Sequence, residues 1–243
     1  MTKKSINQNA NYATELLNSI GSDFDFHNKP INRLKDTTLD FKKDYKDQEN
    51  NKKKMLSKLK EQINSIDDCD LKNNSKKIIL GDGNINSSLM LVGEAPGIEE
   101  DKVGETFMSD AGDLLKKMLV AINIKKEKIY STYAVNFRPP NDRKPTSNEI
   151  KRYSQFLQTH ISIIDPKIII LMGTTAMESL TGLNNKISSE RGKWRDIIIK
   201  NTSYKVIITF NPSYLLRVPE NKKYSWEDLK KIKKKINELN LKV

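Results

Sequence analysis

The chain has 243 residues, a length that suits one large domain or one domain with an appended segment. Its single cysteine excludes a disulfide scaffold and a metal cage built from four thiolates. Charged residues make up 30%, and 43 Lys and Arg against 31 Asp and Glu give a formal net charge of +12. That charge suits a polyanionic partner such as nucleic acid, although the lysine-rich composition of the whole chain explains it equally well.

Two further classes are not expected from the sequence. No apolar run approaches the ~20 residues that cross a bilayer. The N-terminus also lacks the apolar stretch of a secretory signal. We therefore expect a cytoplasmic protein with no membrane partner.

The composition changes near residue 76. Residues 1–75 carry a net charge of only +2, and we expect them to form an N-terminal helical or linker segment. This segment would hold a short helix at Asn11–Ile20, a charged linker or exposed helix at 41–54, and a helix with an apolar stripe at Met55–Ile66. Residues 76–243 carry the remaining +10 and are expected to form the functional domain.

From residue 76 onward, apolar runs alternate with helical patterns. Buried strands are predicted within SSLMLVGEAPG, KIYSTYAV, KIIILMG and YKVIITF. Helices are predicted at Asp110–Asn123, behind a capping box that begins at Thr146, at Thr175–Leu180, and from Ser225. This alternation predicts an α/β fold, a three-layer α/β/α sandwich around a four-stranded parallel sheet.

Three unusual loops follow predicted strands: GEAPG, RPPNDR and NPSYLLR. Ligands bind outside the carboxyl ends of parallel strands, so these loops are expected to enclose one pocket. In the first loop, Gly93 lets the backbone approach a ligand, and Glu94 stands where a carboxylate orients or deprotonates a water. Taken alone, GEAPG is more typical of a tight turn with a surface carboxylate.

The order of the motifs along the chain is the most specific feature of the sequence. The motifs are Gly93-Glu-Ala-Pro-Gly97, Glu100-Asp101, Phe107, Arg138-Pro-Pro140, Arg191-Gly-Lys-Trp194 and Pro212-Ser-Tyr-Leu-Leu-Arg217. In this order they resemble the uracil-DNA glycosylase superfamily, and within it the family 4 type of a bacterial subgroup. The resemblance extends from about residue 10 to 232 and makes residues 76–243 a uracil-DNA glycosylase-like domain.

The resemblance implies a DNA base-excision repair hydrolase. Such an enzyme flips uracil or a related deaminated base out of DNA and hydrolyses its N-glycosidic bond. By this resemblance Glu94 orients the water, Phe107 stacks on the base, and Gly93 and Ala95 line the pocket. A plain core aromatic is the alternative for Phe107.

The resemblance also implies a DNA-binding surface. The loop after the fourth strand would push a wedge into the space that the base leaves, and basic side chains would hold phosphates. Ordinary core packing is an equal alternative for the two leucines of the wedge. The residues implied for this surface are Arg191, Lys193, Ser213, Leu215, Leu216 and Arg217.

The sequence departs from the family at its iron–sulfur cluster. The family 4 type usually holds the cluster with four cysteines. Cys69 matches the first of them, whereas Lys72, Phe137 and Tyr153 stand at the other three positions. We therefore expect no cluster and no other cofactor or metal, and we expect Cys69 to be a buried thiol.

Two further departures concern the base. Tyr133 stands where the family has an Asn that reads the uracil edge, and a phenol cannot make the same paired contact. Asn136 would replace it only if the strand has already ended there. Asn211 stands where the family has a His, and its amide offers a neutral donor for the uracil O2. The chain has two histidines, His27 and His160, and both lie outside the motifs. His160 is expected to face solvent.

Two hypotheses follow. The first is a metal-independent, monomeric glycosylase in which Glu94 and Asn211 are catalytic and Tyr133 contacts the base. The second is a catalytically impaired glycosylase-fold module that binds DNA without hydrolysing it. An unrelated nucleotide-binding α/β protein is a weaker third, since the chain has no P-loop or GxGxxG. The excised base and the preference for single or double strands are left open.

Overall fold

The computed structural model describes residues 33–67 and 69–243, with side chains described from residue 47 onward. The helix expected at Asn11–Ile20 therefore lies outside the described residues. Helix α2 (Arg33–Asn64) includes the charged stretch 41–54, so that stretch is helical. No helix in the described ranges is long and apolar enough to cross a membrane.

Contacts between Cα atoms divide the chain into two units, Met1–Tyr45 and Lys46–Val243. The second unit includes the end of α2, where Leu56, Leu59 and Ile63 are buried in the core as the apolar stripe predicts. The chain from Lys46 onward thus packs as one unit, and everything below concerns that unit.

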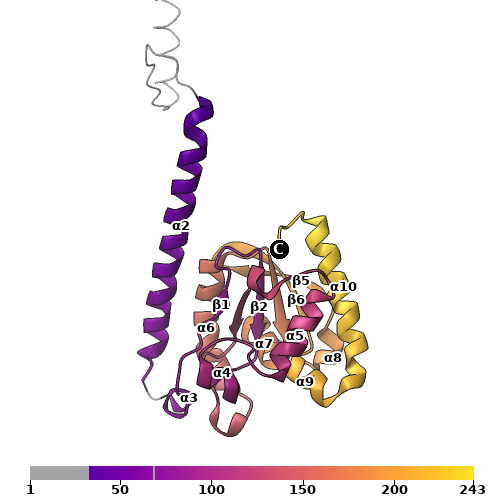
Figure 1. The fold of residues 1–243 in the computed structure, drawn as a ribbon. Helices are drawn as coiled ribbons and strands as arrows, with labels where there is room; N and C mark the ends of the chain where they lie inside the picture. The colour runs from indigo at the N-terminus through magenta and orange to yellow at the C-terminus, as the bar shows by residue number, and fades with distance from the viewer. Residues whose placement is uncertain (1–32, 68) are drawn as a thin grey trace, which may run out of the picture. The chain divides into compact units, whose positions relative to one another are not determined.

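A six-stranded sheet lies at its centre, in the order β1-β3-β2-β4-β6-β5 (Figure 1). The four inner strands β3, β2, β4 and β6 are parallel, as predicted. The prediction of only four strands is wrong, because β1 and β5 add antiparallel edges. The strands are β1 (Asp82–Gly83), β2 (Leu89–Gly93), β3 (Tyr130–Tyr133), β4 (Ile168–Met172), β5 (Trp194–Ile199) and β6 (Thr202–Thr209).

Helices cover both faces of the sheet and complete the three predicted layers (Figure 1). In β4, Ile169 and Leu171 pack in the core cluster that includes α6 and α7 residues, whereas Ile168 and Ile170 pack in the cluster of α5 and α10. Successive residues of a strand face opposite sides, so a wholly apolar run buries both faces. The helices after α2 are α3 (Asp70–Asn74), α4 (Ile98–Val103), α5 (Asp110–Val120), α6 (Ser147–Ile164), α7 (Thr174–Thr181), α8 (Ile187–Glu190), α9 (Pro212–Arg217) and α10 (Lys222–Glu238).

Helix α6 confirms one local prediction and contradicts another. The capping box is present, since Thr146 N–H donates to the Glu149 carboxylate at 2.7 Å and Thr146 Oγ1 accepts from Glu149 N–H. His160 does not face solvent: it is buried, and its Nε2 lies 2.9 Å from the Tyr130 hydroxyl. Burial lowers the pKa of His160 to about 3.

Candidate active site

The carboxyl ends of the parallel strands surround a cavity of about 480 Å³. Its walls come from the segments after β2, β3, β4 and β6, which are far apart in sequence but meet at one edge of the sheet. Seven of the residues that the sequence singled out line it. They are Glu94, Ala95, Phe107, Tyr133, Asn211, Ser213 and Arg217.

The Glu94 carboxylate is held by three donors. Its Oε1 accepts from the Thr174 hydroxyl at 3.1 Å and from Thr175 N–H at 3.0 Å, at the start of α7. Its Oε2 accepts from Asn211 Nδ2 at 2.8 Å. Gly173, at φ +102°, leaves room for this carboxylate, because a Cβ there would lie 2.3 Å from Glu94 Cδ. The carboxylate thus lies at the N-terminal end of α7, where backbone N–H groups point toward it.

Asn211 connects the ends of β2 and β6. While its amide nitrogen donates to Glu94, its Oδ1 accepts from Ser213 N–H at 3.0 Å and from Ser213 Oγ at 2.8 Å. Asn211 is thus the N-cap of α9, which fixes the orientation of its amide. One of its two amide hydrogens donates to Glu94, and the other remains for a ligand in the cavity.

Phe107 and Tyr133 also line the cavity. Their ring centroids lie 5.1 Å apart, and Phe107 N–H donates to the Tyr133 hydroxyl at 2.9 Å. Gly93 makes this arrangement possible, since a Cβ there would lie 2.7 Å from two Tyr133 ring carbons and 2.9 Å from Phe107 Cζ. Phe107 has φ +54°, a left-handed conformation that costs a non-glycine residue about 1 kcal/mol.

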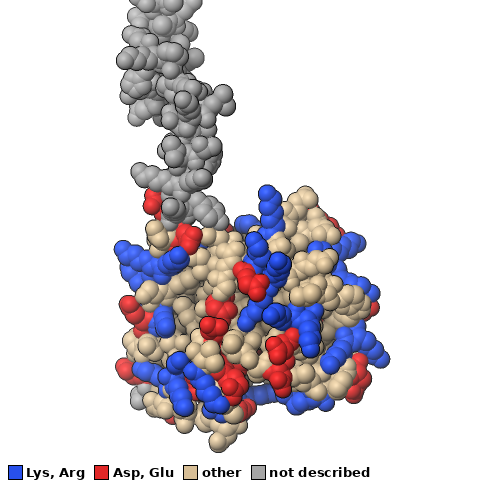
Figure 2. All heavy atoms as spheres, viewed as in Figure 1, with Lys and Arg blue, Asp and Glu red and all other residues tan. Residues whose placement is uncertain are grey.

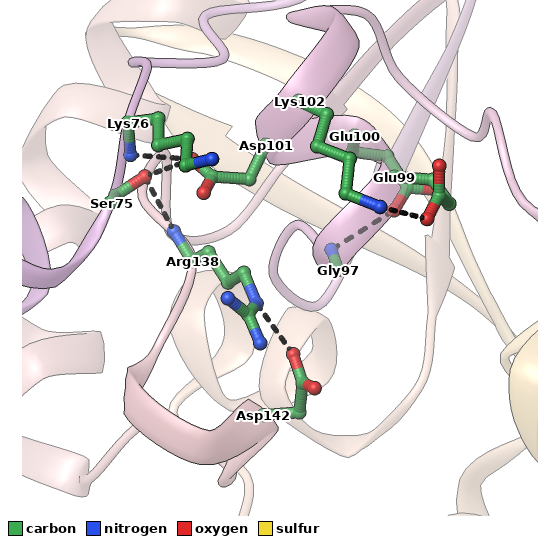
Figure 3. Close-up of polar contacts among 9 residues, drawn as sticks. All are labelled: Ser75, Lys76, Gly97, Glu99, Glu100, Asp101, Lys102, Arg138 and Asp142. Carbon is green, nitrogen blue, oxygen red and sulfur yellow. Dashed lines mark hydrogen bonds and ion pairs between the residues drawn. The ribbon is translucent and has the colours of Figure 1, made fainter.

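Two buried acidic residues, Glu100 and Asp101, connect the loops of the cavity through hydrogen bonds (Figure 3). The Glu100 carboxylate accepts from Gly97 N–H at 3.1 Å and, through its other oxygen, from Met108 N–H at 3.0 Å. Asp101 accepts from the Ser75 hydroxyl at 2.6 Å and from Lys76 N–H at 2.8 Å. These bonds connect the GEAPG loop to the Phe107 segment and to the chain before β1.

The predicted wedge loop folds as α9. Leu215 is fully buried, so it belongs to the core, whereas 42% of Leu216 is exposed. Ser213 and Arg217 line the cavity. Of the two leucines, only Leu216 offers apolar surface to a partner.

The two basic residues of the Arg191–Trp194 motif differ in their surroundings. The Arg191 guanidinium makes two bonds to the buried Asp228 carboxylate, at 2.6 and 3.0 Å, and lies over the Phe210 ring. Burial raises the pKa of Asp228, although the ion pair with Arg191 opposes this shift. Lys193 is exposed, and neither basic residue lines the cavity.

Three of the four positions implied as cluster ligands contact one another, and the four residues do not fit a cluster. Cys69 Sγ lies 3.3 Å from the Tyr153 hydroxyl, and the Phe137 and Tyr153 rings meet edge to face at 6.4 Å. Lys72 Nζ donates to the Asn64 carbonyl. One cysteine, two aromatic rings and a lysine offer no ligand set for iron. Elsewhere in the described residues, no three His, Cys, Asp or Glu side chains gather to hold a metal.

Three residues of the site were not predicted from the sequence. Thr174 and Thr175 hold Glu94, yet the segment after β4 was not counted among the converging loops. The rule that every parallel strand ends at the same edge was sufficient to include it. Glu100 was noted only as part of a motif, because its partners lie in a loop with no regular pattern. Asn136 was considered as a base reader, but its amide donates to the Ile79 carbonyl in the core.

Comparison with known proteins agrees with this geometry. Residues 80–233 match the uracil DNA glycosylase superfamily. The chain is 36% identical over 185 residues to a type-4 uracil-DNA glycosylase of Thermotoga maritima, covering 75% of this chain and 95% of that protein. It is 37% identical to the type-4 enzyme of Sulfurisphaera tokodaii, over 73% of this chain and 83% of that protein.

A third relative, the type-4 enzyme of Archaeoglobus fulgidus, is 33% identical over 73% of this chain and 91% of its own length. The superfamily match covers more than half of the chain and includes every wall of the cavity. The chain therefore belongs to the uracil-DNA glycosylase superfamily.

Proposed function

We propose that this protein excises uracil, or a related deaminated base, from DNA by flipping the base and hydrolysing its N-glycosidic bond. The observation that carries this proposal is that Glu94, Phe107 and Asn211 line one cavity. They come from three separate loops, and a turn with a surface carboxylate would not bring them together. The cavity supplies a carboxylate, an aromatic ring and an amide donor, which are the groups that the reaction needs.

Glu94 orients the attacking water in this proposal. A carboxylate has about four acceptor positions, and three of those on Glu94 are occupied by Thr174, Thr175 and Asn211. The remaining position accepts a hydrogen bond from water. The negative charge also stabilises the positive charge that develops on the sugar as the bond to the base breaks.

Asn211 and Phe107 act on the base. The free amide hydrogen of Asn211 donates to a base carbonyl, where negative charge develops as the electron pair of the glycosidic bond moves to the base. The Phe107 ring stacks on the base, an interaction of roughly 1–3 kcal/mol. Water adds to the sugar carbon, and the base leaves with a proton.

The DNA contacts follow from charge and position. Arg217 and Ser213 lie at the cavity, next to the exposed Leu216, and would contact the strand around the flipped nucleotide. Figure 2 shows Lys and Arg spread over the visible face and interspersed with Asp and Glu. With a formal net charge of +12, DNA binding would depend strongly on salt. The proposed enzyme acts as a monomer and without an iron–sulfur cluster.

The test is release of free base from oligonucleotides that contain uracil, hypoxanthine or xanthine. We expect wild-type protein to release at least one of them and Glu94→Ala to lose about 10²-fold or more of that rate. Robust release that survives Glu94→Ala unchanged would contradict the role of Glu94.

A second function, DNA binding without hydrolysis, is favoured by two observations. The Asn211 amide already donates to Glu94, and Tyr133 occupies the position of the family's base-reading Asn. Tight binding to uracil DNA with no base release would support this function. Gain of activity in a Tyr133→Asn, Asn211→His double variant would then show that the rest of the pocket is intact.

A further inference from the structure

Four consecutive backbone N–H groups, from Thr106 to Ser109, are each bound by a side chain. Asp82 accepts from Thr106 N–H, and the Tyr133 hydroxyl accepts from Phe107 N–H at 2.9 Å. Glu100 Oε1 accepts from Met108 N–H at 3.0 Å and from Ser109 N–H at 3.3 Å. The segment is neither helix nor strand, yet these bonds hold every one of its amides.

The bond to Tyr133 lies at the strained residue of this segment. Phe107 adopts φ +54°, and its carbonyl packs so closely on α5 that a Cβ at Gly112 would lie 1.8 Å from it. A strained conformation persists only where surrounding contacts determine it. The Tyr133 hydroxyl supplies the contact at the Phe107 amide, and its ring supplies the contact at the Phe107 ring.

The same geometry limits what Tyr133 can do for a base. Its hydroxyl oxygen already accepts from the Phe107 amide, and 4% of the residue is exposed. Burial raises the pKa of the phenol, which keeps it protonated. The phenol still has one hydrogen to donate, but it has a single oxygen and so cannot pair with two neighbouring atoms of a base edge as an amide does.

We propose that Tyr133 is a positioning residue, which holds Phe107 in the strained conformation that stacks on the flipped base and does not read the base edge. This inference rests on the proposed function for the role of Phe107, whereas the coupling between the two residues is a property of the free protein. Two consequences follow. Loss of the Tyr133 hydroxyl should weaken the binding of every flipped base by the same factor. It should not change base binding when the Phe107 ring is absent.

The test compares Tyr133→Phe with Tyr130→Phe. Tyr130 is the matched control, because it lies on the same strand, is buried, and has its hydroxyl 2.9 Å from His160, outside the cavity. We expect Tyr133→Phe to raise KM for base release by about fivefold, with kcat little changed, as the loss of one hydrogen bond implies. The factor by which KM rises should be the same for uracil and for a second released base. In a Phe107→Ala background, Tyr133→Phe should have no further effect.

Hydrogen exchange of residues 106–109 in the free protein tests the coupling without DNA. Exchange should be faster in Tyr133→Phe and unchanged in Tyr130→Phe. Three results would each overturn the inference: unchanged hydrogen exchange in Tyr133→Phe, a rise in KM on Tyr133→Phe that persists in the Phe107→Ala background, or a changed preference between bases. If wild-type protein released no base while exchange differed as expected, the proposed function would fail and the coupling of Tyr133 to Phe107 would stand.

Discussion

Two regions of the molecule depart from the family pattern, and they depart in different ways. Around Cys69, three of the residues at the positions implied for the cluster, Cys69, Phe137 and Tyr153, contact one another and are nearly inaccessible to solvent. In the cavity, Tyr133 and Asn211 instead bond to Phe107 and Glu94, and the space between them stays open. The first region is part of the core, whereas the second borders a cavity and is connected by hydrogen bonds between its side chains.

This difference predicts that the two regions respond to different measurements. Changes around Cys69 should alter the free energy of unfolding and leave the rate of base release alone. Changes in the cavity should mainly alter the rate of base release, because Asn211 and Tyr133 bond to Glu94 and Phe107.

The largest effect is expected for Asn211→Asp. This change places a second carboxylate where the amide nitrogen now lies 2.8 Å from Glu94 Oε2, and two adjacent carboxylates do not both ionise readily. We expect base release at neutral pH to fall by about 10²–10³-fold, the effect of losing one such donor in other enzymes. Single-turnover base release at several pH values measures it.

The control for this variant is thermal unfolding, which should show a folded protein whose midpoint is lowered at neutral pH and recovers as the pH falls, because two adjacent carboxylates repel each other only when both are ionised. The pH optimum of base release should also move, because the two neighbouring carboxyl groups of the variant share one proton and titrate as a pair. An Asn211→Asp protein with wild-type rate and pH profile would show that the Asn211–Glu94 contact does not matter for the reaction.

The next effect concerns Tyr153 in the region around Cys69. Tyr153→Ala removes a buried ring that contacts Phe137 and Phe156, so we expect a loss of about 3 kcal/mol in the free energy of unfolding. Tyr153→Phe removes only the contact with Cys69 and should cost about 1 kcal/mol. Urea unfolding measures both, and base release by folded protein should stay at the wild-type level. A rate loss in Tyr153→Phe would link this region to the cavity and break the comparison.

The sequence predicted the parts of the structure that have strong local patterns. The four inner strands are continuous apolar runs, and the loops after them carry distinctive motifs. The edge strands were missed, because β1 has only two residues and β5 pairs on one side alone, with 75% of Ile198 exposed. His160 was misplaced although it lies three residues after Leu157 and four before Ile164, both on the buried face of α6.

The parts of the site that the sequence did not predict depend on contacts between distant residues. Arg191 was expected to hold phosphate, but it pairs with Asp228, 37 residues away on α10. Thr174 and Thr175 reach Glu94 across about 80 residues. No local spacing encodes such pairs, and only the sheet order brings them together.

The third effect is a pH dependence outside the cavity. His160 is buried beside Tyr130, and its pKa falls from 6.5 to about 3 on folding. Below pH 6.5 the unfolded chain therefore binds a proton that the folded protein does not, so stability is lost as pH falls. This group alone should cost about 2 kcal/mol between pH 6.5 and 5. Urea unfolding of wild type and His160→Gln at both pH values measures it, and an equally steep loss in the variant would refute the assignment.

The smallest effect should be seen at the rim of the cavity. Arg217 is exposed there and makes no ion pair with any side chain in the described part of the chain, so it is free to contact phosphate. Arg217→Ala should weaken DNA binding a few-fold and reduce the slope of log affinity against log salt by about one. Arg195→Ala is the control, since Arg195 lies on β5 and already pairs with Glu190. If both variants lowered the slope equally, the positive charge would act as a diffuse field over the whole surface, and the rim would have no special part in holding the strand.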